Sequence, residues 1–191
     1  MENSRGILFI ISAPSGTGKT TIVRRILKEF PDIIFSVSAT TRKKRENEKE
    51  GVDYFFLSEE EFSRKIAKGE FAEWEKFYDY YYGTLRRYID ENLDNGKSVL
   101  LEIDVKGAIK LKEKYPEAVL IFIVPPSFDE LANRLKKRQT EDEIDLQKRI
   151  ERVEMELRLK DKFDYFINNV KLEQAVSDIK SLIENIIKEK K

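Results

Sequence analysis

The sequence predicts an α/β fold in which a parallel sheet is covered by helices on both faces. Short apolar runs rich in branched residues alternate with stretches of helical spacing, which is typical of buried parallel strands joined by helices. The 191 residues suffice for one compact domain with a buried core. Residues 38–88 break the alternation, so we expect an inserted α+β segment there, and insertions often carry a substrate site.

The expected core of the domain comprises residues 1–37, 89–125 and 151–191. Its expected strands are residues 6–12, 33–37, 98–104, 118–124 and 162–168, and its expected helices include residues 20–30 and 172–187. The first strand, GILFIIS, is apolar throughout, which favours burial on both faces. Apolar side chains at Ile22, Val23 and Ile26 give the first helix one buried face, and Pro31 ends it.

The inserted segment contains both kinds of element. We expect a strand at 52–57, a helix from Ser58 to Gly69, a strand at 71–78 and a helix at 84–95. Ser58 and Glu61 have the spacing of a capping box, which predicts where the first of these helices begins. Two further capping boxes, Ser127 with Glu130 and Thr140 with Glu143, predict a pair of helices within residues 126–150.

The composition excludes several classes of chemistry. The chain has neither Cys nor His, which removes disulfides, thiolate or imidazole catalysis and metal sites with those ligands. Phosphoryl transfer suits the remaining residue types, because it depends on positioning and charge stabilisation. Lys+Arg and Asp+Glu are 36 each, so no net charge points to nucleic acid or an anionic membrane. With no signal peptide expected in the polar N-terminus, we expect a cytoplasmic protein.

A glycine-rich turn joins the first strand to the first helix in the stretch ISAPSGTGKTT. Backbone N–H groups of residues 15–20 would turn towards a phosphate, and the helix N-terminus would add positive potential. Lys19 would bridge the β- and γ-phosphates, and the hydroxyl of Thr20 would ligate Mg²⁺. The stretch is therefore a P-loop and predicts a P-loop NTPase-type sheet, although Ala13 stands where the common pattern has Gly.

A GTPase is one alternative for a P-loop protein. Residues 104–107, DVKG, match the Asp-x-x-Gly switch pattern of that class. The Asn-Lys-x-Asp motif with which GTPases read the base occurs nowhere in the sequence. The four-residue match therefore carries little weight.

The polar loop of the inserted segment suggests a second phosphate site. Arg42, Arg45 and Tyr54 lie on or beside this loop and could converge on a dianionic phosphate, which Arg binds through two parallel hydrogen bonds. A solvated basic face is the alternative, and it fits the neighbouring lysines better than the arginines.

Ten segments in order resemble the guanylate kinase family, and together they cover almost the whole chain. They are SAPSGTGKT, SVSATTRKKR, GVDYFF, FAEWEKF, YYYGT, LEIDVKGA, FIVPPS, LANRLKKR, KRI and FINN. The family transfers the γ-phosphate of ATP to GMP or dGMP, giving ADP and GDP or dGDP, with Mg²⁺. The resemblance implies a GMP-binding segment at 38–88 and a helical lid at 126–150.

The resemblance also implies roles for individual residues. The GMP phosphate would be held by Arg42, Arg45, Tyr54 and Tyr82, and the base and the rest of the nucleotide by Ser38, Glu73, Thr84 and Asp104. ATP would contact Ala13, Pro14, Ser15, Gly16, Thr17, Gly18, Lys19, Thr20 and Asn168. Both Asn168 and Asn169 would lie near the adenine. The catalytic residues would be Lys19 and the lid arginines Arg134, Arg138 and Arg149. Thr20 and Glu102 would orient Mg²⁺, although the family commonly has Asp in place of Glu102.

Base choice has a simple chemical reason. Guanine presents the donors N1–H and N2–H₂, and one carboxylate can accept from both, whereas adenine offers no such pair. Glu73 would be that carboxylate, with a hydroxyl from Thr84. A kinase for another acceptor such as AMP and a non-catalytic module that binds a protein partner remain alternatives. The expected partners are ATP and GMP or dGMP, with no nucleic acid and no membrane, in a monomer or homodimer.

Overall fold

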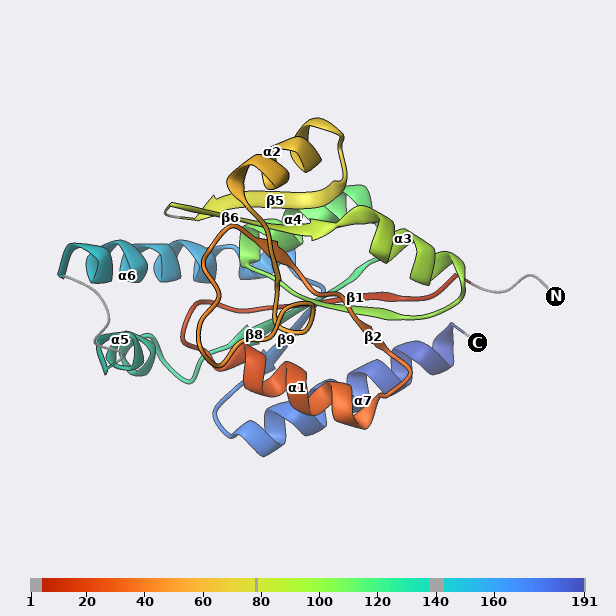
Figure 1. The fold of residues 1–191 in the computed structure, drawn as a ribbon. Helices are drawn as coiled ribbons and strands as arrows, with labels where there is room; N and C mark the ends of the chain where they lie inside the picture. The colour runs from red at the N-terminus through yellow and green to blue at the C-terminus, as the bar shows by residue number, and fades with distance from the viewer. Residues whose placement is uncertain (1–4, 78, 138–142, 191) are drawn as a thin grey trace. The chain divides into compact units, whose positions relative to one another are not determined.

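The computed structural model describes residues 5–77, 79–137 and 143–190 and has the predicted α/β fold. Five strands form one sheet in the order β2-β7-β1-β8-β9 (Figure 1). They are β1 (Leu8–Ser12), β2 (Ile34–Phe35), β7 (Val99–Glu102), β8 (Val119–Val124) and β9 (Tyr165–Asn168). The pairs β1–β8, β2–β7 and β8–β9 are parallel, and β1 is buried along its whole length, as its apolar sequence predicted.

The chain divides into two compact units. The first unit comprises Met1–Leu8, Asp32–Leu101 and Lys110–Ala118. The second unit comprises Phe9–Pro31, Glu102–Ile109 and Val119–Lys191.

In the second unit, two helices lie side by side (Figure 1). They are α1 (Lys19–Glu29) and α7 (Leu172–Glu189). Ion pairs join their exposed edges, from Arg25 to Glu173 at 3.1 Å and from Lys180 to Glu29 at 2.6 Å. The predicted apolar stripe of α1 is buried. The unit also contains α5 (Phe128–Lys137) and α6 (Glu143–Arg158).

The first unit is built around a four-stranded sheet in the order β4-β3-β6-β5. Its strands are β3 (Ala39–Thr40), β4 (Phe55–Phe56), β5 (Phe71–Phe77) and β6 (Tyr80–Leu85), and its helices are α2 (Glu59–Ala67) and α3 (Arg86–Asp94). The side chain of Phe62 on α2 is fully buried and stacks on Phe71, with ring centroids 4.3 Å apart. The predicted capping box of α2 is confirmed, because Ser58 and Glu61 each accept from the other's backbone N–H.

Two parts of the prediction were wrong. Residues 84 and 85 belong to β6 and not to the following helix, because Thr84 pairs across the sheet with Glu73. Gly83 allows this pairing, since a Cβ there would come within 2.9 Å of the ring of Phe71. Helix α4 (Val105–Lys114) was not among the expected elements, although its buried residues Val105, Ala108 and Leu111 have helical spacing. Within the described residues, no helix is long and apolar enough to span a membrane.

Candidate active site

The glycine-rich turn lies between β1 and α1 in the second unit, as the sequence predicted. Gly16 and Gly18 have φ angles of 86° and 92°, a conformation that side chains other than Gly rarely adopt. Gly18 is the N-cap of α1, so no side chain caps the helix, and no acid lies in its first turn. The N–H groups and positive potential of this helix end therefore remain available to an anion.

Two side chains hold the turn in shape. The hydroxyl of Thr17 donates to the carbonyl of Pro14 at 2.7 Å. The amide of Asn169, which follows β9, donates to the carbonyl of Thr17 at 2.7 Å, and both residues are buried. Asn168, the residue predicted to contact ATP, is exposed beside it. Asn169 thus contacts the backbone of the turn itself.

The P-loop lysine is held by a backbone carbonyl. Lys19 Nζ donates to the carbonyl oxygen of Ile103 at 2.7 Å. Ser12 Oγ donates to the same oxygen at 2.9 Å. The ammonium group is therefore fixed at the end of β7 by a neutral partner, which an anion can replace without breaking an ion pair.

Two oxygen groups meet at the start of α1. Thr20 Oγ1 donates to Glu102 Oε1 at 2.5 Å, so the two predicted metal-orienting residues are in contact. Among the described residues, no group of three acidic side chains is arranged to hold a metal ion. This donor set fits Mg²⁺, which takes few protein oxygens and fills its shell with water and substrate phosphates.

The second unit also contains a charged group that the sequence did not reveal. Arg152 of α6 donates to Glu156 at 2.8 Å and lies 3.6 Å from the carboxylate of Asp104. The pKa of Glu156 is raised, mainly because the carboxyl is buried, and the negative charge of Asp104 raises it further. The hydrogen bond and positive charge of Arg152 and the charge of Lys19 lower this pKa but do not cancel the effect of burial. Asp104 Oδ1 also accepts from the backbone of Lys106, at the start of α4. The i,i+4 spacing of Arg152 and Glu156 was the available signal, but it is also common on solvated helices.

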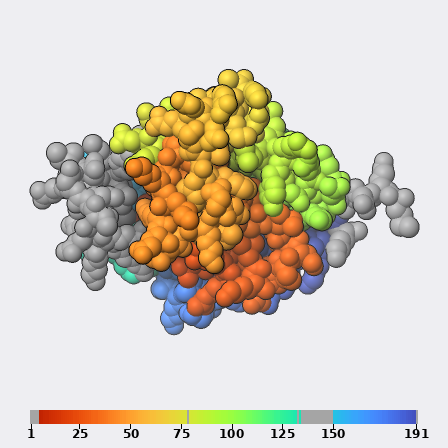
Figure 2. Space-filling view, viewed as in Figure 1, coloured from red at the N-terminus to blue at the C-terminus, as the bar shows by residue number. Residues whose placement is uncertain are grey.

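Three of the predicted acceptor-phosphate residues, Arg42, Tyr54 and Tyr82, lie close together in the first unit. The guanidinium carbon of Arg42 lies 5.5 Å from the ring centroid of Tyr54, whose ring is 6.1 Å from that of Tyr82. Arg42 is ion-paired with Glu48 at 2.6 Å. Figure 2 shows the chain between β3 and α2, in shades of orange, at the surface in this view. A small anion could therefore reach this loop.

Glu48 links both arginines of the loop. Its second oxygen accepts from the backbone N–H of Arg45 at 2.8 Å. Burial would raise the pKa of the Glu48 carboxyl, but hydrogen bonds from Arg42 and Arg45 and their positive charges lower it. Burial would also lower the pKa of Arg42, but Glu48 and Tyr82 together raise it. Both groups of the pair are therefore ionised at neutral pH.

The two predicted base-reading residues are hydrogen-bonded to each other. Antiparallel pairing of β5 with β6 places Glu73 opposite Thr84. Thr84 Oγ1 donates to Glu73 Oε1 at 2.7 Å, and both residues are buried. A carboxylate has about four lone-pair sites, so Glu73 can accept from more than one donor.

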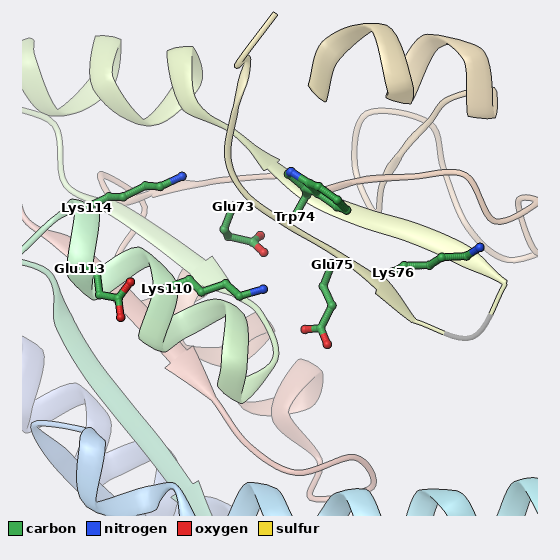
Figure 3. A pocket seen from close by; sticks show the side chains of 7 residues that line it. All are labelled: Glu73, Trp74, Glu75, Lys76, Lys110, Glu113 and Lys114. Atoms are coloured by element: carbon green, nitrogen blue, oxygen red, sulfur yellow. The ribbon is translucent and has the colours of Figure 1, made fainter. Parts of the chain in front are cut away.

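Glu73 lines a pocket of about 380 Å³ within the first unit, and most of the other lining residues also carry charge. Figure 3 shows Glu73 and Glu75 directed to the same side of β5, towards Lys110 of α4, with Trp74 on the opposite side. This alternation follows from the strand period of two. Lys114 closes another part of the pocket and donates to the carbonyl of Ala72. The volume is that of a small-molecule site.

The remaining predicted residues are distributed as follows. Ser38 lies directly before β3 in the first unit, whereas Asp104 belongs to the second unit. Ala13 and Pro14 are buried and Ser15 is exposed at the turn. Of the lid arginines, Arg138 lies outside the described residues, and for Arg134 in α5 and Arg149 in α6 only the helix is described. Helix α6 continues to Arg158, beyond the expected end of the lid at residue 150.

Comparisons with known proteins identify the family that the chain resembles. The family model described as "Guanylate kinase" matches residues 5–186. A guanylate kinase from Thermotoga maritima is 45% identical over 181 residues, which are 95% of this chain and 87% of the relative. A guanylate kinase from Caldanaerobacter subterraneus is 48% identical over 179 residues, which are 94% of this chain and 87% of the relative.

A solved structure is similar along the same length. The crystal structure of guanylate kinase from Anaplasma phagocytophilum aligns with a TM-score of 0.79 at 34% identity. The alignment covers 97% of this chain and 88% of that one.

Proposed function

The chain belongs to the guanylate kinase family, an ATP:GMP phosphotransferase family, and from this premise we propose which of its residues carry out the reaction. The transfer moves the γ-phosphate of ATP to GMP and gives ADP and GDP. In this proposal, dGMP is a second acceptor. Residues 38–88 form the GMP-binding segment, residues 126–150 the lid, and the rest of the single domain the core.

The second unit holds ATP. Backbone N–H groups of residues 15–20, at the N-terminus of α1, surround the β-phosphate, and Asn168 lies near the adenine. Lys19 leaves the carbonyl of Ile103 for the β- and γ-phosphates, where its charge stabilises the transferring group. The neutral partner of Lys19 supports this step, because the exchange breaks no ion pair.

The first unit holds GMP. Arg42, Arg45, Tyr54 and Tyr82 bind its phosphate, and Ser38 contributes to the base site. Glu73 accepts from guanine N1–H and N2–H₂ while Thr84 holds its other side. Asp104 also contacts the acceptor nucleotide. No general base is needed, because the GMP phosphate is already ionised at neutral pH.

Thr20 and Glu102 are the residues that would hold the Mg²⁺ that accompanies ATP. Thr20 would ligate it and Glu102 would hold its waters, as their 2.5 Å contact supports. When bound, Mg²⁺ neutralises charge that develops on the phosphate oxygens. The lid arginines Arg134, Arg138 and Arg149 approach the ATP phosphates when the lid closes. Closure excludes water, which would otherwise take the phosphate from ATP.

The proposal extends to the protein's surroundings. We place the enzyme in the cytoplasm, as a monomer or homodimer that binds neither nucleic acid nor membrane. Its equal numbers of acidic and basic residues support the absence of a polyanionic partner.

One observation carries the choice of GMP over other acceptors: the buried hydrogen bond between Glu73 and Thr84. It orients the Glu73 carboxylate, and one carboxylate can accept from two adjacent donors, which guanine has and adenine lacks. The test is to measure ADP formation from ATP·Mg²⁺ with GMP, dGMP, AMP or no acceptor. ADP formation should depend on GMP or dGMP. Equal rates with AMP would contradict the base assignment, and ADP formation without any acceptor would indicate hydrolysis.

A further inference from the structure

The acceptor-phosphate loop contains one acid whose two carboxylate oxygens have different partners. Glu48 Oε1 accepts from Arg42 Nη2 at 2.6 Å, and Glu48 Oε2 accepts from the backbone N–H of Arg45 at 2.8 Å. The side chains of Arg42 and Glu48 are only 12% and 16% exposed. A single carboxylate therefore joins the side chain of one arginine to the backbone of the other.

Arg42 is fixed from several directions. Its Nη1 donates to the carbonyl of Lys43 at 2.7 Å, and its guanidinium carbon lies 5.5 Å above the ring of Tyr54. Glu48 supplies the ionic contact in this set. A long side chain that is already ordered loses little rotamer freedom when a ligand binds, so preorganisation raises affinity.

The bridge needs a glutamate. A carboxylate accepts from two separate donors at once, whereas the amide of Gln has one acceptor oxygen and an NH₂ that would face a donor. Asp keeps the charge but is one methylene shorter, so it cannot span the same two donors. The lowered pKa of Glu48 is consistent with an ionised bridge at neutral pH.

We propose that Glu48 is a positioning residue that holds Arg42 and the backbone of Arg45 in place for the phosphate of GMP. This role rests on the proposed function, in which both arginines bind that phosphate. Glu48 acts through the arginines and does not touch the nucleotide. The opposite role is a competitor, in which the carboxylate occupies Arg42 until GMP displaces it. The two roles predict opposite signs: removing a positioning residue weakens GMP binding, and removing a competitor strengthens it.

The test is titration calorimetry of GMP and of guanosine with the wild type, Glu48→Gln, Glu48→Asp and the control Glu46→Gln. For both Glu48 variants, the Kd of GMP should rise by about 10- to 100-fold, while that of guanosine stays constant. Glu46 is exposed on the same loop, so its variant removes the same charge without the bridge and should bind GMP within about twofold of wild type. In steady-state assays, KM for GMP should rise more than kcat falls.

Three outcomes would overturn the role of Glu48. They are unchanged or tighter GMP binding by Glu48→Gln, wild-type binding by Glu48→Asp, and an equal loss for guanosine, which would indicate damage to the whole segment. Arg42→Lys separates this failure from a failure of the proposed function. If Arg42→Lys weakens GMP binding and Glu48→Gln does not, only the role of Glu48 is wrong. If neither variant changes it, the phosphate site itself is misassigned.

Discussion

The two proposed phosphate sites rely on different kinds of chemical group. In the second unit, the turn after β1 relies on backbone conformation, with two glycines at positive φ and one lysine held by a carbonyl. In the first unit, the loop around Arg42 relies on long side chains, held by Glu48 and by the ring of Tyr54. In the site built from backbone, one lysine carries the positive charge. In the site built from side chains, several residues share the contacts to the phosphate.

Lys19→Met tests the turn after β1, where one residue carries the charge, and should have the largest effect on activity. Removing a preorganised charge at a transferring phosphate should lower kcat by on the order of 10²–10³. The fold should remain intact, because the partner of Lys19 is a neutral carbonyl that also accepts from Ser12. Steady-state kinetics and thermal unfolding measure the two quantities. Near-normal turnover would show that the turn after β1 is not the catalytic phosphate site.

Glu73→Gln tests the base-reading part of the first unit. The amide presents a donor to guanine donors, which leaves a buried group unpaired at about 1–3 kcal/mol, more when charge is lost. The kcat/KM for GMP should therefore fall by roughly 10- to several-hundred-fold at 1.36 kcal/mol per factor of ten. The low activity with AMP should change less. An equal loss for both nucleotides would mean that Glu73 supports the pairing of β5 with β6 and does not read the base.

Arg45→Lys tests how much one arginine of the first unit contributes to binding the GMP phosphate. The charge is kept but the two-pronged hydrogen bond is lost, so the Kd of GMP should rise by roughly tenfold or less. Lys44→Arg, one residue earlier on the exposed loop, is the control and should leave GMP binding unchanged. If calorimetry gives the same GMP affinity for Arg45→Lys and wild type, Arg45 belongs to the solvated face of the loop.

The smallest expected effect is on stability. Its pH dependence should have opposite signs for one acid in the first unit, Glu48, and one in the second unit, Glu156. The pKa of Glu48 is lowered, so its stabilisation is present above pH 4.5 and is lost as pH falls through the folded-state pKa. The pKa of Glu156 is raised, so stability falls as pH rises from 4.5 through the folded-state pKa. Denaturant unfolding measured across pH should show that the free energy of unfolding of Glu156→Gln rises relative to that of the wild type above pH 4.5. Glu48→Gln should be less stable than the wild type above pH 4.5, and this difference in the free energy of unfolding should disappear below pH 4.5. Parallel curves would mean that neither acid is shifted by folding.

The difference between a site built from backbone and one built from side chains also explains what the sequence could predict. The turn at Lys19 has a signature of fixed spacing, because backbone geometry demands glycine at set positions. The pairing of Glu73 with Thr84 has no such signature, since it arises only when β5 and β6 form a ladder, and Thr84 was assigned to a helix. Resemblance to a family supplied these two residues where local pattern did not.

Arg152 and Glu156 were missed for a related reason. Their spacing is ordinary on a helix surface, and only the packing of α6 buries Glu156 and brings Arg152 to within 3.6 Å of Asp104. Similarly, Glu48 is one of many acids in a charged stretch, and its two partners become apparent only when the loop has folded. Sequence therefore predicts sites built on backbone conformation better than those built on contacts between distant side chains.

The hydrogen bond from Asn169 to Thr17 has a consequence for how the protein is made. It joins residues 152 positions apart, so a turn that leaves the ribosome early acquires this contact only after Asn169 has been synthesised. Until then, the nascent chain carries the signature of a phosphate site without one of its supports. The complete hydrogen-bonding of the turn therefore forms only when most of the chain has been synthesised.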